Sequence, residues 1–357
     1  MCTRHHRHSI FCILPPYLLR EILANGSKAQ KAAASRALGI DTTFRTMRVR
    51  LAVAQSVTDR RHRKLALPAA RQRSIYTAGN SETLPGTLVR AEGQGPSGDA
   101  AVDEAYDALG HTFDFFLEAY RRNSIDDDGL PLDATVHYGE DYNNAFWNGQ
   151  RMVFGDGDGQ LFNRFTASLD VIGHELGHGV TEDEAGLVYM QQPGALNESL
   201  SDVWGSLVKQ WVLKQTAAEA DWIIGAGLFT QKVHGVGLRS MKAPGTAYDD
   251  PVLGKDRQPG HMKDYVDTMQ DNGGVHINSG IPNRAFYLAA TAIGGNAWER
   301  AGRIWYDTLR DARVTETTKF ADFAAVTVDV AGRLPGSKKA EVKAVADAWK
   351  QVGIPTG

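Results

Sequence analysis

The stretch that decides the fold is Val171-Ile172-Gly173-His174-Glu175-Leu176-Gly177-His178, which contains the pattern H-E-x-x-H. It lies in a segment, Phe165–Thr181, that we predict to be helical. On a helix, residues i and i+4 share a face, so His174 and His178 are expected to direct two imidazoles at one metal ion. Glu175 lies beside them and is a candidate base for an attacking water. Taken alone, the pattern also fits two histidines on a surface helix that bind nothing.

A third ligand is expected downstream, because a catalytic zinc usually takes three protein ligands and keeps a fourth position for water. Glu198 follows His178 by 20 residues, which leaves room for a turn and a second helix, predicted over Asn197–Leu213. Asp202, one turn further on, faces the same way and is expected to accept the second ring N–H of a ligand histidine. The alternatives are that Glu198 is an acid facing the helix dipole and that Asp202 is a solvated helix residue.

With this spacing, H-E-x-x-H followed by N-E-x-x-S-D resembles the thermolysin family of gluzincin metallopeptidases. The similarity runs from about residue 74 to the C-terminus and includes further segments in the family's order, namely Asn143–Gly149, Ala185–Tyr189, Leu238–Met241 and Asp271–Gly280. The resemblance implies an α+β metalloprotease of two lobes, a mixed sheet-and-helix lobe and a helical lobe, with the H-E-x-x-H helix between them. The implied activity is that of a zinc-dependent endopeptidase.

The resemblance also implies a role for individual residues. One catalytic zinc ion would be held by His174, His178 and Glu198, with Asp202 and Asn197 supporting these ligands. The residues implied for catalysis are Glu175 as the proton carrier, His276 and Tyr189 as donors to the oxyanion, and Asp271, which would orient His276. Without the resemblance, His276 in its glycine-rich segment, read as a loop, is a weak candidate.

Peptide binding is implied for a further set of residues. Asn144 and Ala145 would hold an extended substrate as an added strand, and Arg239 would grip a substrate carbonyl. The pocket for the residue after the cut would be lined by Phe162, Phe165, Val171, Ile224 and Leu238. Such a pocket predicts cleavage on the N-terminal side of Leu, Phe, Ile or Val. The alternative is that all five are ordinary core residues.

The N-terminal part differs in composition from the rest. Residues 45–73 are rich in arginine and lysine, and Asp59 is the only acidic residue among them. Such a composition is typical of an exposed, protease-accessible connector. We therefore expect residues 1–73 to be a propeptide and cleavable connector, residues 74–190 an N-terminal α/β lobe, and residues 191–357 a C-terminal helical lobe. Removal is expected between about residues 50 and 73, where Lys64-Leu65 and Ala66-Leu67 suit an enzyme that cuts before leucine.

Before this connector, Pro15-Pro16-Tyr17 is similar to the signature of the protealysin branch of the family, whose compact propeptides block the cleft until they are removed. The implied partner is thus the chain's own propeptide, besides peptide and protein substrates. The alternative is an N-terminal arm without a regulatory role. Cys12 precedes Pro15 by three residues, so its thiolate is close enough to reach the zinc; the alternative is a small buried apolar side chain.

Calcium is doubtful as a second metal. At the positions that correspond to the family's double calcium site, Asp170 and Asp221 are kept, but the others are Lys209, Ile223 and Ala226, and a further calcium position is Val236. An ammonium group cannot ligate calcium, yet Lys209 is placed to neutralise Asp170 in the metal's stead. We therefore expect stability to depend little on calcium.

Charge and hydropathy argue against a nucleic-acid-binding protein and a membrane-spanning protein. The formal net charge is -3, which favours no nucleic-acid partner, and the apolar runs are too short for a membrane span. The stretch Ile10–Leu14 is too short for a classical signal peptide, so cytoplasmic accumulation stands beside the family's habit of secretion. We expect a monomer.

A zinc exopeptidase would need acidic anchors for the substrate amine in a G-x-M-E-N type segment, which is not found. A peptide-binding pseudoenzyme is disfavoured because Glu175, Glu198 and His276 are all present.

Overall fold

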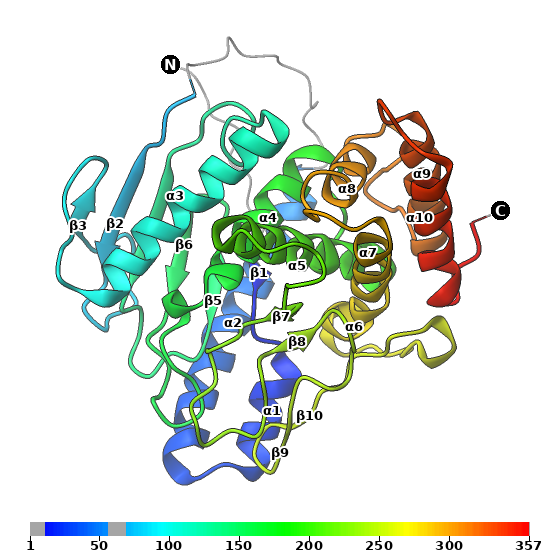
Figure 1. The fold of residues 1–357 in the computed structure, drawn as a ribbon. Coiled ribbons are helices and arrows are strands. Elements are labelled where there is room, and N and C mark those ends of the chain that lie inside the picture. Colours follow the sequence, from blue (N-terminus) through cyan, green and yellow to red (C-terminus); the bar gives the residue numbers. More distant parts are fainter. Residues whose placement is uncertain (1–10, 56–68, 357) are drawn as a thin grey trace.

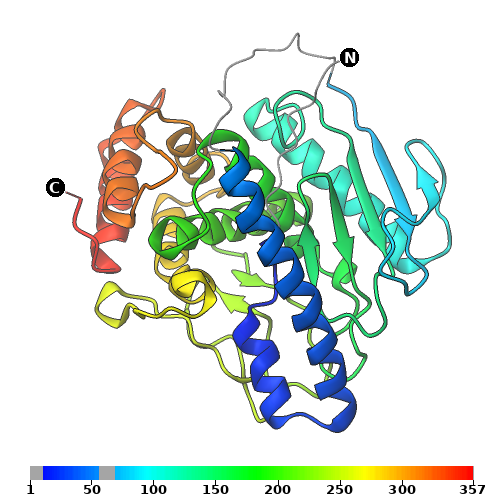
Figure 2. The same ribbon diagram turned by 180° about the vertical axis from the view of Figure 1, so that it is seen from behind.

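A mixed sheet and a group of helices form the two halves of the body (Figure 1), in a computed structural model that describes residues 11–55 and 69–356. The N-terminal helices α1 (Pro16–Asn25) and α2 (Lys28–Gln55) lie together across the back of the molecule (Figure 2). The first half holds most of the strands and the second holds α5 to α10. The predicted α+β class with two lobes is confirmed. The lobe boundary at residue 190 stays a prediction.

The large sheet has the strand order β1-β5-β6-β4-β2-β3. Its strands are β1 (Phe11–Cys12), β2 (Arg73–Thr77), β3 (Thr87–Ala91), β4 (Leu132–Val136), β5 (Ala145–Trp147) and β6 (Arg151–Phe154). The strand β4 runs parallel to β2 and β6, while the pairs β2–β3, β5–β6 and β1–β5 are antiparallel. The strand β5 lies inside the family-like segment of residues 143–149. Four two-residue strands, β7 (Ile223–Ile224), β8 (Arg239–Ser240), β9 (Asp249–Asp250) and β10 (Gly254–Lys255), form two small ribbons.

The other helices follow the apolar periodicity, with shifted ends. They are α3 (Ala100–Tyr120), α4 (Leu169–Glu184), α5 (Gln191–Leu213), α6 (Asp271–Asn278), α7 (Gly280–Ile293), α8 (Ala301–Leu309), α9 (Phe320–Arg333) and α10 (Lys339–Gln351), with short 3-10 turns η1 (Phe165–Ala167) and η2 (Met262–Asp264). The helix predicted from Asn197 begins six residues earlier. The helix predicted from Phe165 is divided, because η1 precedes α4. Within the described residues, none of the helices has the length and apolar character that crossing a membrane requires.

Capping sets the start of α3, which covers the sheet. Asp99 is the N-cap, and its Oδ1 accepts hydrogen bonds from the N–H groups of Ala101 and Val102. Ser97, two residues before Asp99, could also cap a helix, but it donates its hydroxyl hydrogen to Asp103 Oδ1. An aspartate caps as well as a serine, so the nearer residue to the helix takes the position.

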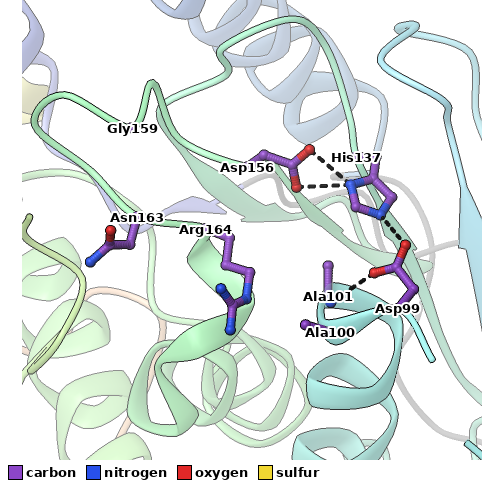
Figure 3. Close-up of a pocket in the computed structure, with 8 residues that line it drawn as sticks. All are labelled: Asp99, Ala100, Ala101, His137, Asp156, Gly159, Asn163 and Arg164. Carbon is purple, nitrogen blue, oxygen red and sulfur yellow. Dashed lines mark hydrogen bonds and ion pairs between the residues drawn. The ribbon is translucent and has the colours of Figure 1, made fainter. Parts of the chain in front are cut away.

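A charged triad links the start of α3 to the end of β4 and to the turn after β6 (Figure 3). His137 Nε2 lies 2.9 Å from Asp99 Oδ2, and His137 Nδ1 lies 2.8 Å from Asp156 Oδ2. The hydrogen bond with Asp156 is the largest cause that raises the pKa of His137 to about 9, and Asp99 adds to it. These three side chains border a pocket of about 360 Å³. His137 therefore carries a positive charge at neutral pH and joins two carboxylates.

The closest packing between helices is that of α4 on α5, and glycines permit it. A Cβ atom on Gly205 of α5 would lie 2.2 Å from the Asp170 carbonyl oxygen, and one on Gly173 of α4 would lie 3.0 Å from Gly205 Cα. The two backbones therefore touch where a larger residue would force them apart. This contact brings the side chains of α5 within reach of those on the H-E-x-x-H helix.

The N-terminal segment, which we define as the described residues 11–55, is helical into the part that was expected to be an exposed connector. The helix α2 reaches Gln55, so residues 45–55 of the presumed connector are helical. Arg73 was also assigned to the connector, but it lies in β2, is 7% exposed and binds Glu92. The cleavage pairs at residues 64–67 lie outside the described residues. An exposed connector is thus restricted to a shorter stretch than residues 45–73.

Candidate active site

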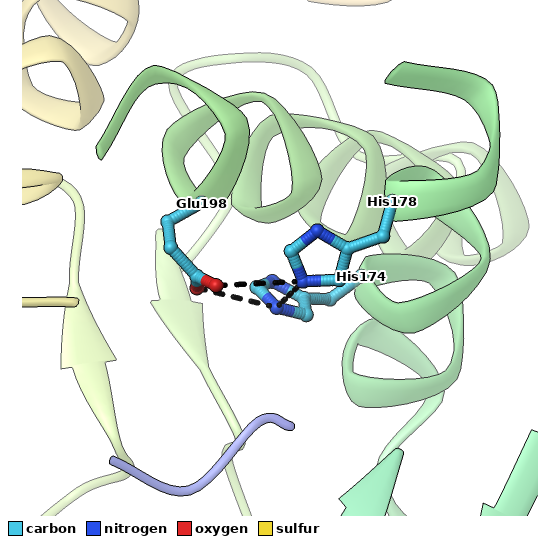
Figure 4. A group of neighbouring side chains, drawn as sticks. All are labelled: His174, His178 and Glu198. Carbon is cyan, nitrogen blue, oxygen red and sulfur yellow. Dashed lines mark hydrogen bonds and ion pairs between the residues drawn. The ribbon is translucent and has the colours of Figure 1, made fainter. Parts of the chain in front are cut away.

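His174, His178 and Glu198 converge on one point (Figure 4), where ligand atoms from all three lie within 4.8 Å of one another and all three side chains are buried. The Nε2 atoms of the two histidines are 3.1 Å apart. Glu198 Oε2 lies 3.6 Å from His174 Nε2, and its Oε1 lies 3.5 Å from His178 Nε2. Ligands at 2.0–2.1 Å from a tetrahedral zinc ion lie about 3.3 Å from each other. The three separations therefore fit one zinc ion.

The outer nitrogens of both imidazoles are held by oxygen acceptors. His174 Nδ1 donates to Asp202 Oδ1 at 2.7 Å, and His178 Nδ1 donates to Asn197 Oδ1 at 2.7 Å. In a neutral imidazole the Nε2 atom then carries a lone pair. Two such lone pairs and a carboxylate face one another, an arrangement that a cation between them satisfies. These donors suit zinc, which prefers nitrogen and oxygen ligands of this kind.

Two contacts in this shell were not anticipated. Ser201 places its hydroxyl 2.9 Å from His178 Nδ1, and Asn283 of α7 donates to Asp202 Oδ2 at 2.8 Å. Ser201 could have been found one residue before Asp202 in the conspicuous S-D pair. Asn283 has a fainter signal, since it is a polar residue, fully buried, in a mostly apolar helix.

Asp202 also joins the metal cluster to Arg239. Arg239 Nε and Nη2 donate to the two Asp202 oxygens, each at 2.8 Å, as a bidentate pair. Burial alone would raise the pKa of Asp202, but the charge of Arg239 and the bond from His174 outweigh it and hold that pKa well below its ordinary value. Asp202 is therefore ionised throughout the neutral range, and it fixes both a ligand imidazole and the guanidinium.

Glu175 lies one residue after His174 and is fully buried. Its Oε2 accepts a hydrogen bond of 3.2 Å from the Trp147 N–H of β5. The edge of the sheet thus fixes the carboxylate beside the metal cluster. The position suits a group that receives a proton and passes it on.

His276 lies in α6, not in the loop predicted from its glycines. Asp271, Asn272, Gly273 and Gly274 all have positive φ, so the chain makes a left-handed turn before the helical residues begin. Asp271 closes this turn, because its Oδ2 accepts from the His276 N–H at 2.9 Å and its Oδ1 lies 2.6 Å from His276 Nδ1. The turn residues that suggested a loop therefore orient the imidazole.

Tyr189 and His276 meet on the open side of the cluster. Tyr189 Oη lies 3.1 Å from His276 Nε2 and donates to Glu198 Oε1. His276 Nε2 is 3.4 Å from the same Glu198 oxygen. The polar ends of Tyr189 and His276 thus meet at the same Glu198 oxygen.

The strand β5 lies second in the sheet, and the N-terminal segment supplies the edge strand β1 that pairs with it. Phe11 pairs with Trp147 and Cys12 with Phe146 in the antiparallel sense. The Ile13 N–H donates to the Ala145 carbonyl at 3.2 Å, and the Leu14 N–H donates to Asn144 Oδ1 at 3.1 Å. Arg239 Nη1 donates to the Ile13 carbonyl at 3.2 Å. The three residues expected to hold a substrate backbone thus hold the chain's own backbone.

The cysteine of this strand does not direct its sulfur at the metal cluster. Cys12 Sγ lies 3.2 Å from Asp41 Oδ1 of α2, whereas its carbonyl oxygen lies 3.1 Å from His276 Nε2. The interpretation of Cys12 as a small apolar side chain is incomplete as well, since its thiol has a polar partner. Pro15 and Pro16 follow as the cap and first residue of α1, and Tyr17 is buried.

All five residues expected to line a substrate pocket are buried, each 0–3% exposed. They are Phe162, Phe165, Val171, Ile224 and Leu238. The rings of Phe162 and Phe165 are 5.8 Å apart, and Leu238 and Ile224 are joined by a backbone hydrogen bond. They belong to the same continuous apolar cluster as Ile13 and Leu14. Their role as a pocket stays a prediction.

Lys209 lies between Asp170 and Asp221, two acids at positions for which the family resemblance implied calcium ligands. Its Nζ lies 2.7 Å from Asp170 Oδ2, 2.9 Å from Asp221 Oδ1 and 2.7 Å from the Ile223 carbonyl oxygen. Burial would lower the pKa of Lys209, but the two carboxylates outweigh it, so the pKa lies above its ordinary value. One ammonium group thus binds three oxygens that a cation would otherwise take.

The fold, together with a buried cluster of two histidines and one glutamate that could hold a metal ion, indicates a metallopeptidase. Family models agree: residues 43–182 match the thermolysin metallopeptidase catalytic domain, and residues 185–354 match the thermolysin metallopeptidase alpha-helical domain. The chain belongs to the thermolysin family of zinc-dependent metalloendopeptidases, which are hydrolases.

Individual relatives extend over nearly the whole chain. It is 56% identical over 346 residues to an extracellular metalloprotease of Pectobacterium carotovorum subsp. carotovorum, covering 97% of this chain and 96% of that protein. It is 50% identical to protease PrtS of Photorhabdus sp. (strain Az29), covering 96% and 91% respectively. Among solved structures, the precursor of protealysin, a metalloproteinase from Serratia proteamaculans, matches with a TM-score of 0.87 and 57% identity, covering 96% of this chain and 99% of that one. The predicted protealysin-like branch is confirmed.

Proposed function

We propose that this chain hydrolyses internal peptide bonds on the N-terminal side of bulky apolar residues, with one zinc ion held by His174, His178 and Glu198. The observation that carries the proposal is the convergence of these ligands beside Glu175. When bound, zinc supplies a Lewis acid that polarises the scissile carbonyl and makes water more acidic. The apolar cluster around Phe162 and Leu238 supports the preference for apolar residues.

The side chains around the cluster would then divide the work. Glu175 takes a proton from the attacking water and delivers it to the leaving amine. His276 and Tyr189 donate hydrogen bonds to the carbonyl oxygen as it gains negative charge, each contributing about 3–4 kcal/mol in comparable sites. Asp271 keeps His276 in place. Their position around the metal cluster supports these roles.

The backbone of the substrate would be held along β5. Asn144, Ala145 and Arg239 present an amide oxygen, a carbonyl and a guanidinium at intervals that match an added antiparallel strand. That the N-terminal strand uses all three supports this assignment.

The N-terminal segment would be a propeptide that keeps the precursor inactive. Its strand covers the substrate edge of β5, and its helices are tied to the body by Glu21 with Arg257 and by Arg36 with Asp141. A substrate cannot pair with β5 while β1 does. The similarity to the precursor of protealysin supports this assignment. Removal would follow a cut in the basic stretch between α2 and β2.

Calcium would be dispensable, because Lys209 fills the acidic site. The enzyme would act outside the cell, because the Pectobacterium relative is named an extracellular metalloprotease. The enzyme would act as a monomer, since the described site is assembled from a single chain. Size-exclusion chromatography of the mature enzyme checks the last point.

A casein assay tests the activity. The mature enzyme is expected to cleave casein before Leu, Ile, Phe or Val, as read from the product termini, and to stop when 1,10-phenanthroline removes zinc. Glu175→Gln is expected to keep zinc but lose activity. Release of single residues only would indicate an exopeptidase, and intact casein with bound zinc would indicate a pseudoenzyme.

A further inference from the structure

One peptide bond of the N-terminal segment, the bond between Cys12 and Ile13, lies at the candidate active site. The carbonyl oxygen of this peptide group is 3.1 Å from His276 Nε2. Its N–H, which belongs to Ile13, is 3.2 Å from the Ala145 carbonyl oxygen. The two polar ends of a single peptide group are therefore held from opposite sides, one by a donor and one by an acceptor.

The neighbouring groups fix this register. Arg239 holds the Ile13 carbonyl, and Asn144 holds the Leu14 N–H. A slip by one residue would turn every side chain to the other face of the strand. Pro15 and Pro16 have no N–H to pair, so the hydrogen bonding that continues past β1 ends at Leu14, and the chain enters α1. This register therefore places the bond between Cys12 and Ile13, and not a neighbouring bond, at the candidate active site.

His276 joins the same carbonyl to the candidate site. His276 Nε2, which donates to Cys12 O, is 3.4 Å from the ligand atom Glu198 Oε1 and 3.1 Å from Tyr189 Oη. Glu175 is fixed by the Trp147 N–H, and Trp147 is the residue that pairs with Phe11 just before Cys12. The carbonyl is therefore held by one proposed oxyanion donor, His276, which itself contacts Glu198 and Tyr189.

The residue after the bond matches the proposed preference. Ile13 is 0% exposed and belongs to the continuous apolar core of the molecule, of which the five predicted pocket residues are also part. A bulky apolar side chain directly after the peptide bond at the metal is the feature by which the proposed endopeptidase would choose its bond. The N-terminal strand thus has the chemistry of a substrate as well as the position of one.

We propose that the enzyme cuts its own Cys12–Ile13 bond within the same chain, and that the proposed inhibitory segment is held as a clipped product. This rests on the proposed function. Water adds across the peptide bond: its hydroxyl oxygen bonds to the Cys12 carbonyl carbon, the C–N bond breaks, and Glu175 passes a proton to the Ile13 nitrogen. The products are a Cys12 carboxylate and a free Ile13 amino group.

The cut would not by itself release the segment. Leu14, Leu18, Leu19 and Ile22 are all buried, at 0–1% exposed, and α1 continues into α2. Ile13 and Leu14 therefore stay tethered to helices that remain packed on the body, at a high effective concentration. The clipped chain is expected to stay inactive toward casein until a second cut, after α2, frees those helices.

The experiment starts from the full chain with its metal removed by a chelator, to which zinc is added at time zero. N-terminal sequencing and intact mass are expected to show a new chain starting at Ile13, formed at a rate that does not change when protein is diluted tenfold. Glu175→Gln is expected to remain uncut. Ile13→Pro, which removes the N–H that Ala145 holds, is also expected to remain uncut.

Alkylation of the Cys12 thiol in the absence of zinc tests whether the N-terminal strand is bound to β5. In the metal-free chain, Cys12 is 2% exposed, so iodoacetamide is expected to modify its thiol at least about tenfold more slowly than in urea. Peptide mapping separates Cys12 from Cys2. The same protection is expected in Glu175→Gln, which shows that this variant fails to cut although its strand is in place.

Several results would overturn the proposal. One is an uncut Cys12–Ile13 bond in wild-type chain whose enzyme, once freed of residues 1–73, hydrolyses casein; the proposed function would then survive alone. A second is cutting that slows on dilution or appears in Glu175→Gln when mature enzyme is added, since either marks a cut between molecules. Absence of casein hydrolysis by the freed, zinc-loaded enzyme would remove both this proposal and the proposed function.

Discussion

Replacing Lys209 by alanine is expected to destabilise the enzyme strongly, although this residue is far from the chemistry. The change leaves Asp170, whose side chain is 1% exposed, without the ammonium that contacts its Oδ2, while Oδ1 keeps Ser168 and the Gly225 N–H. Removing one member of a buried ion pair costs about 3–5 kcal/mol. The Lys209 side chain is 11% exposed and Asp221 is 47% exposed, so water compensates in part and the lower end, about 3 kcal/mol, applies.

Thermal unfolding of the mature enzyme measures this effect. At about 2–4 °C per kcal/mol for chains somewhat smaller than this one, Lys209→Ala is expected to lower Tm by about 6 °C. The matched control is Lys242→Ala, because Lys242 is exposed and its loss is expected to change stability by less than about 0.5 kcal/mol.

The same measurement of Tm, made in EGTA and in calcium, tests whether Lys209 replaces a calcium ion. Wild-type Tm is expected to be the same in EGTA and in calcium, because the ammonium occupies the site. Lys209→Glu instead gathers carboxylates and the Ile223 carbonyl around an empty centre, so its Tm is expected to fall in EGTA and to rise with calcium, by about 2.7 kcal/mol at a hundred times Kd. The reasoning is refuted if EGTA lowers the wild-type Tm, or if Lys209→Ala behaves like Lys242→Ala.

Three further predictions concern the site, the N-terminal segment and the charged triad. Tyr189→Phe in the mature enzyme is expected to lower kcat by about 10²–10³ with little change in KM, because a donor to the oxyanion is lost; an unchanged kcat contradicts the role. Ile13→Asp in the precursor is expected to raise casein hydrolysis at least about tenfold, because the buried strand loses its apolar anchor and takes up a charge, whereas the exposed change Arg20→Asp is expected to leave it unchanged; an inactive Ile13→Asp precursor argues against inhibition by the strand. His137 has a folded pKa of about 9 against about 6.5 unfolded, so its stabilising charge is fully present below pH 6.5 and is lost as pH rises through 9; the difference in Tm between wild type and His137→Gln is expected to shrink between pH 7 and pH 10, and a constant difference contradicts it.

The metal cluster could be predicted from sequence because local geometry determines most of it. The helical period fixes the separation of His174 and His178, and the distance to Glu198 permits one turn and one returning helix. What sequence could not show is how closely that second helix approaches. The answer lies in Gly173 and Gly205, whose missing side chains let the backbones touch, and neither glycine is conspicuous in isolation.

Other parts escaped prediction because short elements carry no periodicity. The strand β5 has three residues between asparagines, and β1 has two, so neither shows an alternating pattern. Their pairing depends on a contact between residues about 135 positions apart. The helix of His276 was hidden for a different reason, since Asn272 and Gly273 are turn formers, and here the turn leads directly into the helix. Local signals alone mark a turn without revealing whether a helix or a loop comes after it.

X-ray absorption at the zinc edge, made on the mature enzyme together with its zinc content, tests the central claim most directly. The account predicts one zinc ion per chain with two imidazole nitrogens and carboxylate oxygen at about 2.0–2.2 Å, and loss of both the zinc and the casein hydrolysis in His178→Ala. Full zinc content in His178→Ala, or casein hydrolysis that continues in the metal-free enzyme, would contradict it.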